Sequence, residues 1–189
     1  MIQDPNYYFE PDSNCDFGKG SCISIGKFDG VHLGHQKLLE LNRRLSKKLD
    51  LVSVVIILFP NPKYFFNSLL NPNDNFQIIM SPEARLFKIK DLGFDCVEVI
   101  KFDQCLADWS ARDFVDFLVT KYNIKMWVAG KDLTFGKNKT GNIDFLKSTS
   151  IENNFGVEIC EPLVIDNQVV SSSLIRSRKI QGISYDNLM

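Results

Sequence analysis

Residues 24–35 have the sequence Ser-Ile-Gly-Lys-Phe-Asp-Gly-Val-His-Leu-Gly-His, and this stretch constrains the fold more than any other. An apolar run at residues 22–25 leads into it, and a helical pattern over residues 36–49 follows it. Glycines at positions 26, 30 and 34 let the backbone bend sharply and approach a ligand closely. The stretch therefore predicts a strand, a tight turn and the start of a helix.

This junction holds both histidines of the protein, His32 and His35. The first N–H groups of a helix have no partner within the helix, and the helix dipole adds partial positive charge there, so a phosphate fits the position. The two histidines are three residues apart and can reach one phosphate together. An ordinary strand-turn-helix connection with polar histidines is the alternative. The gathering of glycines, an aspartate and both histidines within one turn favours the phosphate site.

Strand and helix patterns alternate along the rest of the chain. Further strands are predicted at the apolar runs of residues 51–58, 95–100, 126–129 and 157–159. Helices are predicted after His35, where leucines recur at positions 38, 41, 45 and 49, and after the capping serines Ser81 and Ser110. This alternation predicts an α/β fold, one domain over residues 1–189, in which helices flank a mostly parallel sheet. Ligands bind such sheets at the carboxyl ends of the strands.

The composition excludes some classes of protein. A net charge of −1 over 189 residues argues against a general nucleic-acid binder, and no apolar run is long enough to span a membrane. The amino-terminal residues lack the apolar core of a signal peptide. Five scattered cysteines without a CxxC pair, together with only two histidines, do not predict a structural zinc site. We expect a reduced, cytoplasmic protein.

Two loops follow predicted strands and would lie at the same edge of the sheet. Pro60-Asn61-Pro62 stops the second strand, because proline cannot donate to the ladder, and the aromatic residues Phe65 and Phe66 after it suit a core and a ligand site equally. Residues 67–77, with four asparagines and a proline, are expected to form a loop.

The second such loop, residues 130–141, is flanked by glycines and carries three lysines, Lys131, Lys137 and Lys139, together with Asp132 and Phe135. The lysines can meet phosphate oxygens, and the aromatic ring can stack on a flat ligand. A solvated, charged surface loop is the alternative, but the position after a buried strand favours function.

A last segment, Ser171-Ser172-Ser173-Leu174-Ile175-Arg176, begins another predicted helix. The serines suit helix capping and decide little. Arg176 is more informative, because its planar, always-charged guanidinium near a helix start can hold triphosphate oxygens through paired hydrogen bonds.

The histidine junction resembles the signature of the HxGH nucleotidylyltransferases. With Phe28-Asp29-Gly30 ahead of the histidines, it resembles the FMN adenylyltransferase (FAD synthetase) module of the bacterial bifunctional riboflavin kinase/FAD synthetases. The other three segments resemble motifs of that family in the same order. The chain departs from the family pattern at four positions: Lys27, where Asn is usual, Leu58 for Phe, Asn61 for His, and Leu133 for an aromatic residue.

The resemblance implies a Rossmann-like nucleotidylyltransferase fold and transfer of AMP from ATP to FMN, which gives FAD and pyrophosphate. It implies catalytic roles for His32, His35 and Arg176, with no metal bound by the protein itself and Mg²⁺ arriving with ATP. The implied ATP-binding residues are Gly26, Phe28, Asp29, Gly34, Ser172 and Arg176. The implied FMN-binding residues are Asn61, Asp132 and Phe135, with Lys137 and Lys139 as candidates for phosphate contact.

Two other functions stay open. One is a related HxGH enzyme with a different phosphate acceptor, and the other is a catalytically weak domain that binds flavin nucleotide or a partner protein. The bifunctional relatives carry a riboflavin kinase domain after the helix of Arg176, whereas this chain stops at Met189. We therefore expect no kinase activity from this chain, and a riboflavin kinase domain outside it is a candidate partner.

Overall fold

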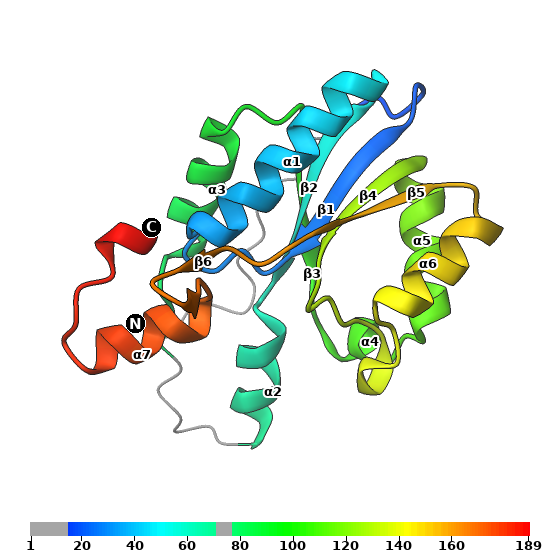
Figure 1. The fold of residues 1–189 in the computed structure, drawn as a ribbon. Coiled ribbons are helices and arrows are strands. Elements are labelled where there is room, and N and C mark those ends of the chain that lie inside the picture. Colours follow the sequence, from blue (N-terminus) through cyan, green and yellow to red (C-terminus); the bar gives the residue numbers. More distant parts are fainter. Residues whose placement is uncertain (1–14, 71–76) are drawn as a thin grey trace.

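The computed structural model describes residues 15–70 and 77–189. Five parallel strands form one sheet in the order β3-β2-β1-β4-β5 (Figure 1). These strands are β1 (Ser21–Gly26), β2 (Val52–Phe59), β3 (Cys96–Lys101), β4 (Ile124–Gly130) and β5 (Gly156–Cys160). All five carboxyl ends therefore meet at one edge of the sheet. The prediction of a mostly parallel α/β fold is confirmed.

Helices cover both faces of this sheet. One face is covered by α1 (Leu33–Leu49) and α3 (Pro82–Asp91), and the other by α5 (Ala111–Tyr122) and α6 (Ile143–Glu152) (Figure 1). Two further helices, α2 (Pro62–Leu70) and α7 (Ser172–Ile180), lie beyond the carboxyl edge. The remaining elements are α4 (Gln104–Ala107), the short antiparallel pair β6 (Val164–Ile165) and β7 (Gln168–Val169), and two 3₁₀ turns, η1 (Lys137–Lys139) and η2 (Asp186–Leu188).

The order of the strands has a switch point beside β1. The chain runs outward from β1 through β2 to β3, and then returns to place β4 on the other side of β1. The crossover helices diverge there, which leaves a crevice at the carboxyl ends of β1 and β4. Both the histidine turn and the loop after β4 begin at that crevice.

Strand β2 shows why the sheet is buried on both faces. Val54 and Ile56 pack into the core on the α5 side, and Val55 and Ile57 pack into the core on the α1 side. A parallel strand covered by helices on both faces has no solvated side, which explains the unbroken apolar run in the sequence.

The helix after the histidines differs in detail from the prediction. It begins at Leu33, and its buried residues are Leu39, Asn42 and Ser46, whereas Leu49 is 43% exposed. Asn42 is fully buried because its amide donates to the carbonyl of Cys22 at 3.1 Å and to the hydroxyl of Ser24 at 3.0 Å. A hydrogen-bonded polar residue therefore lies on the buried face of α1, which the row of leucines alone did not indicate.

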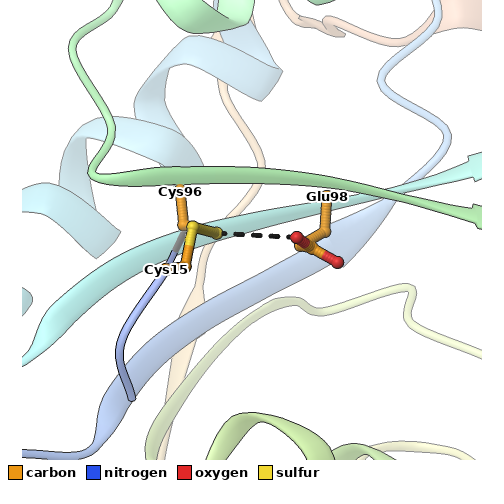
Figure 2. A group of neighbouring side chains, drawn as sticks. All are labelled: Cys15, Cys96 and Glu98. Carbon is orange, nitrogen blue, oxygen red and sulfur yellow. Dashed lines mark hydrogen bonds between the residues drawn. A yellow bond between two sulfur atoms is a disulfide. The ribbon is translucent and has the colours of Figure 1, made fainter. Parts of the chain in front are cut away.

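Two further expectations need correction. Residues 67–70 belong to α2 rather than to a loop, while residues 71–76 of the expected loop lie outside the described part. The cysteines are not all reduced, because Cys15 and Cys96 form a disulfide (Figure 2). This bond ties the segment before β1 to the start of β3. Among the described helices, none is long and apolar enough to cross a membrane.

Candidate active site

The two histidines meet at the start of α1. His32 is the N-cap, and its Nδ1 accepts a hydrogen bond from the backbone N–H of His35 at 3.3 Å. The two rings stack with their centroids 3.6 Å apart. A neutral His32 whose Nδ1 accepts must carry its proton on Nε2, so Nε2–H is the group it can offer to a ligand. The predicted meeting of both imidazoles at a helix start is present.

The turn before the histidines has a strained backbone. Phe28 and Val31 have positive φ angles of 47° and 42°, and Gly30 between them has a φ of 88°. Left-handed backbone is unusual for a bulky or β-branched residue, and such strain persists only where the surroundings hold it. The ring of Phe28 lies over Gly26 and meets the ring of His35 edge to face, with centroids 5.4 Å apart. The ring of Phe28 thus packs against the imidazole of His35, and Gly26 leaves room for that ring.

A buried carboxylate, Asp29, binds two guanidinium groups within this turn. Its Oδ1 accepts from Arg85 at 3.5 Å, and its Oδ2 accepts from Arg176. Arg85 also donates to the carbonyl of Lys27 at 2.9 Å, and Ser172 donates to the carbonyl of Asp29 at 3.0 Å. The network joins the turn after β1 to α3 and α7, and it places Arg176 beside the histidines.

The two histidines, Asp29 and Arg176 line a cavity of about 310 Å³ at the crevice between β1 and β4. Its polar and charged lining residues are Lys27, Asp29, His32, His35, Asn61, Lys63, Lys131, Asp132, Glu161, Ser171, Ser172, Ser173 and Arg176. The apolar part of the wall includes Leu38, Leu163 and Val170. Both imidazoles, several cationic side chains and the start of α1 therefore line one cavity.

Gly34 lets the backbone of α1 approach this cavity. A Cβ at this position would lie 2.9 Å from the carbonyl oxygen of Val170 and 3.2 Å from the ring of His32. A backbone carbonyl cannot move aside cheaply, so only glycine fits between α1 and the segment that leads to α7.

Burial keeps both imidazoles neutral in the absence of a ligand. It lowers the pKa of His32 to about 4, although the charge of Asp29 opposes the shift. Burial lowers the pKa of His35 well below 6.5, and electrostatic interactions with His32, Lys27 and Arg85 lower it further. The Nδ1 atom of His35 is buried and has no hydrogen-bond partner among the described residues. An anion in the cavity would favour the protonated imidazoles and would therefore raise both pKa values.

A second hollow, which lies between α2 and α7, adjoins the first cavity. It is lined by Lys63, Ser173, Arg176, Ser177, Ile180 and Gln181. Three of these residues, Lys63, Ser173 and Arg176, also line the first cavity, so the two spaces share a cationic wall.

Some predicted site residues lie away from the cavity. Phe135 is 9% exposed and packs between Phe114, Trp127 and Phe145 in the core on the α5 side. Lys137 pairs with Asp108 at 2.9 Å, and both Lys137 and Lys139 belong to η1, outside the set of residues that line the cavity. The stacking role expected for Phe135 is therefore corrected, because its ring completes the core. Asn61 and Asp132 do line the cavity.

Sequence reasoning missed three cationic residues at the site, Lys27, Lys63 and Arg85, whereas Lys131 is the one lysine of the 130–141 loop that lines the cavity. Lys27 directly follows β1 and lines the cavity; burial lowers its pKa, although the nearby Asp132 opposes the shift. Lys27 interrupts a family-like motif, which was a usable signal. Arg85 sits within an ordinary helical pattern, and nothing local marks it as a partner of Asp29.

Comparisons with known proteins identify the family of the chain. Residues 16–174 match the family described as FAD synthetase. The chain is similar to bifunctional riboflavin kinase/FMN adenylyltransferases: 36% identical to that of Buchnera aphidicola (subsp. Schizaphis graminum) over 82% of this chain and 49% of the relative, and 30% identical to that of Bacillus subtilis over 86% and 50%. The chain thus spans about half the length of the curated relatives it matches.

A solved structure shares the fold. A Streptococcus pneumoniae crystal structure described as a macrolide-efflux protein matches with a TM-score of 0.73 and 27% identity, over 90% of this chain and 54% of that one.

Proposed function

The chain belongs to the FAD synthetase family, and we propose that it transfers AMP from ATP to FMN, giving FAD and pyrophosphate. The observation that carries this proposal is the meeting of His32, His35, Arg176 and the start of α1 around one cavity. The relatives are named as both kinases and adenylyltransferases and are about twice as long as the matched region. We propose that this chain corresponds to their adenylyltransferase part and works beside a riboflavin kinase domain outside it.

The chemistry requires no nucleophilic side chain. The phosphate of FMN is itself an anion and attacks the α-phosphorus of ATP in line, and pyrophosphate leaves on the opposite side. The protein must hold the two substrates in this geometry and stabilise the negative charge that builds on the α-phosphate. The backbone N–H of Gly34, together with the dipole of α1, supplies a donor that needs no rearrangement during the reaction, whereas the N–H of His35 already donates to Nδ1 of His32.

The histidines act as donors matched to that charge. His32 offers its Nε2–H, and His35 lies beside it within the same stack. Both are neutral before substrate binds, so neither repels the nearby lysines and arginines. The α-phosphate raises the pKa of His35, and the imidazole then carries more positive charge as the transition state forms.

Arg176 binds the β- and γ-phosphates in this scheme. In the free protein it donates to Asp29 and to the carbonyl of Gln77 at 2.9 Å, which fixes its guanidinium beside the cavity. Its planar fork can hold two phosphate oxygens, and its position on the wall shared with the second hollow lets it face both substrates. Lys63, on the same wall, reduces the repulsion between the two phosphate groups that must approach.

FMN would lie on the side of Asn61 and Asp132. The amide of Asn61 can donate and accept hydrogen bonds but cannot titrate, so this position orients the flavin without a proton transfer. Mg²⁺ would enter with ATP. The carboxylate of Asp132 lines the cavity and suits a cation that prefers oxygen ligands, whereas both oxygens of Asp29 are already occupied by guanidinium groups. The ion would neutralise charge on the triphosphate.

A direct assay tests the proposal. Purified protein is incubated with FMN, ATP and Mg²⁺, and FAD and pyrophosphate are measured by chromatography and a coupled assay. Pantetheine phosphate, nicotinamide mononucleotide and glycerol phosphate serve as competing acceptors. We expect FAD to form and the competitors to be left unused. Tight FMN binding without turnover would instead indicate a binding domain, and turnover of another acceptor would indicate a related nucleotidylyltransferase.

A further inference from the structure

A cluster of metal-ligating side chains lies far from the proposed active site. Cys15, Cys96 and Glu98 each place a ligand atom within 4.8 Å of the others (Figure 2). Cys96 and Glu98 are two residues apart on β3, so their side chains share the face of the sheet that α5 covers. Cys15 comes from the segment before β1, which is held against α5 by the contact of Phe17 with Tyr122.

The Glu98 carboxylate is poorly satisfied for a buried charge. The residue is 6% exposed, and its Oε2 accepts from Lys121 and from the hydroxyl of Tyr122, both at a long 3.4 Å. Its Oε1 lies 3.8 Å from the sulfur of Cys96. A disulfide sulfur has no proton to donate, so this contact stabilises the carboxylate only when Cys96 is a thiol or when a cation bridges the two atoms.

Charge and ligand type both suit a divalent cation. Two thiolates and one carboxylate carry three negative charges, and Lys121 supplies one positive charge beside them. A divalent ion would bring the buried cluster to neutrality. Thiolate ligands select thiophilic metals, and a set of two sulfurs and one carboxylate with one open position suits tetrahedral Zn²⁺.

We propose that Cys15, Cys96 and Glu98 form a Zn²⁺ site in the reduced protein, and that the disulfide is the oxidised, metal-free state of the same three side chains. A dithiol reductant donates two electrons to the S–S bond and is itself oxidised to a disulfide, and two protons convert the sulfurs to thiols. Zn²⁺ then binds both sulfurs and the carboxylate and displaces the two thiol protons to solvent. The Cα atoms are 6.0 Å apart, so side-chain rotation can open the sulfurs around a metal without moving β3.

Either state ties the same two segments together. The cysteines are 81 residues apart, so the link joins the start of the described chain to the strand at the edge of the sheet. Sequence spacing gave no hint of the site, because the fold rather than a short motif brings the ligands together. The site is separate from the histidine cavity, so this inference stands apart from the proposed adenylyltransferase activity.

Cobalt serves as the probe, since Co²⁺ takes the ligands of Zn²⁺ and absorbs light when thiolates bind it. The full chain is reduced with a phosphine under nitrogen and titrated with Co²⁺. We expect one equivalent to bind with thiolate-to-cobalt charge-transfer absorption, and Zn²⁺ to abolish that absorption. The disulfide form should show no such band. Cys15→Ser and Cys96→Ser should each lose it, and Glu98→Gln should weaken binding by about tenfold or more.

Cys105→Ser is the matched control, because Cys105 is an exposed free cysteine away from the cluster. Its titration should equal that of the reduced wild type. If Cys96→Ser fails to fold by circular dichroism, Cys15→Ser carries the test, since Cys15 is only half-buried. A reduced wild type without the charge-transfer band, or a band that survives both serine variants, overturns the site. Unchanged affinity in Glu98→Gln overturns the ligand role of the carboxylate.

Discussion

The Asp29 carboxylate holds the Arg176 guanidinium across 147 residues of sequence. It also pairs with Arg85, and both of these partners are largely buried. Asp29 therefore does two things at once, because it neutralises two arginines and fixes the one that lines the cavity.

Asp29→Asn is expected to destabilise the protein. Removing one partner of a buried ion pair leaves the other charge uncompensated, which costs about 3–5 kcal/mol. Urea unfolding at pH 7 measures the loss. Asp132→Asn is the matched control, since it changes a carboxylate that lines the same cavity, and we expect its stability to stay within about 0.5 kcal/mol of the wild type. Equal stability of the two variants would contradict a structural role for the Asp29 pairs.

His35→Ala is expected to lower kcat by about 10²–10³-fold while the Kd for ATP changes little. The reason is that, in the proposed mechanism, the imidazole acts on charge that appears mainly in the transition state. Single-turnover kinetics and equilibrium binding of ATP separate the two effects. Parallel losses in both quantities would mean that His35 serves ground-state binding instead.

Lys27→Met is expected to raise the KM for ATP by about tenfold with a smaller effect on kcat. The ammonium lines the cavity next to the histidines, and its loss removes one charge that attracts the triphosphate. Lys27→Arg should restore most of the affinity, because it keeps the charge. Steady-state kinetics of both variants checks this, and a methionine variant with wild-type KM would exclude Lys27 from ATP binding.

Stability should fall as the pH is lowered from 7 to 5. The pKa of His32 is about 4 in the folded protein and about 6.5 in the unfolded chain, so in this range the unfolded chain binds a proton that folded His32 excludes. Protonation of this group stabilises the unfolded state relative to the folded state by about 2 kcal/mol at pH 5. His32→Gln removes the titration, so its unfolding free energy should fall less over the same range. An identical pH dependence in both proteins would show that His32 titrates normally.

Phe135→Leu tests the corrected position of this ring. We expect it to cost roughly 1–2 kcal/mol in unfolding free energy, since it alters a packed core, and to leave the KM for FMN unchanged. Asn61→Ala should raise the KM for FMN and leave the unfolding free energy unchanged, because Asn61 lines the cavity. A raised KM for FMN in the leucine variant would return Phe135 to the flavin site.

Sequence patterns were sufficient where the physics is local. The pattern of residues 24–35 predicted a strand, a bend and a helix start. The serine caps at Ser81 and Ser110 were also correct. A serine hydroxyl that accepts a hydrogen bond from an N–H three residues later depends on no distant element. Hydrophobic runs likewise identified the buried strands.

The features that the sequence did not predict depend on contacts between distant segments. The buried Asn42 is decided by carbonyls of two strands, and Arg85 and the Cys15–Cys96 bond are decided by packing across the sheet. Phe135 shows the same limit, because a ring in a glycine-flanked loop can turn outward to a ligand or inward to Trp127, and only the assembled core distinguishes the two.

The separation of Asp29 from Arg176 also bears on synthesis. A nascent chain that has left the ribosome only as far as β5 already contains both imidazoles, the strained turn and Arg85, yet it lacks the guanidinium that α7 delivers. The proposed anion-binding site is therefore completed only after all the strands of the central sheet have been synthesised.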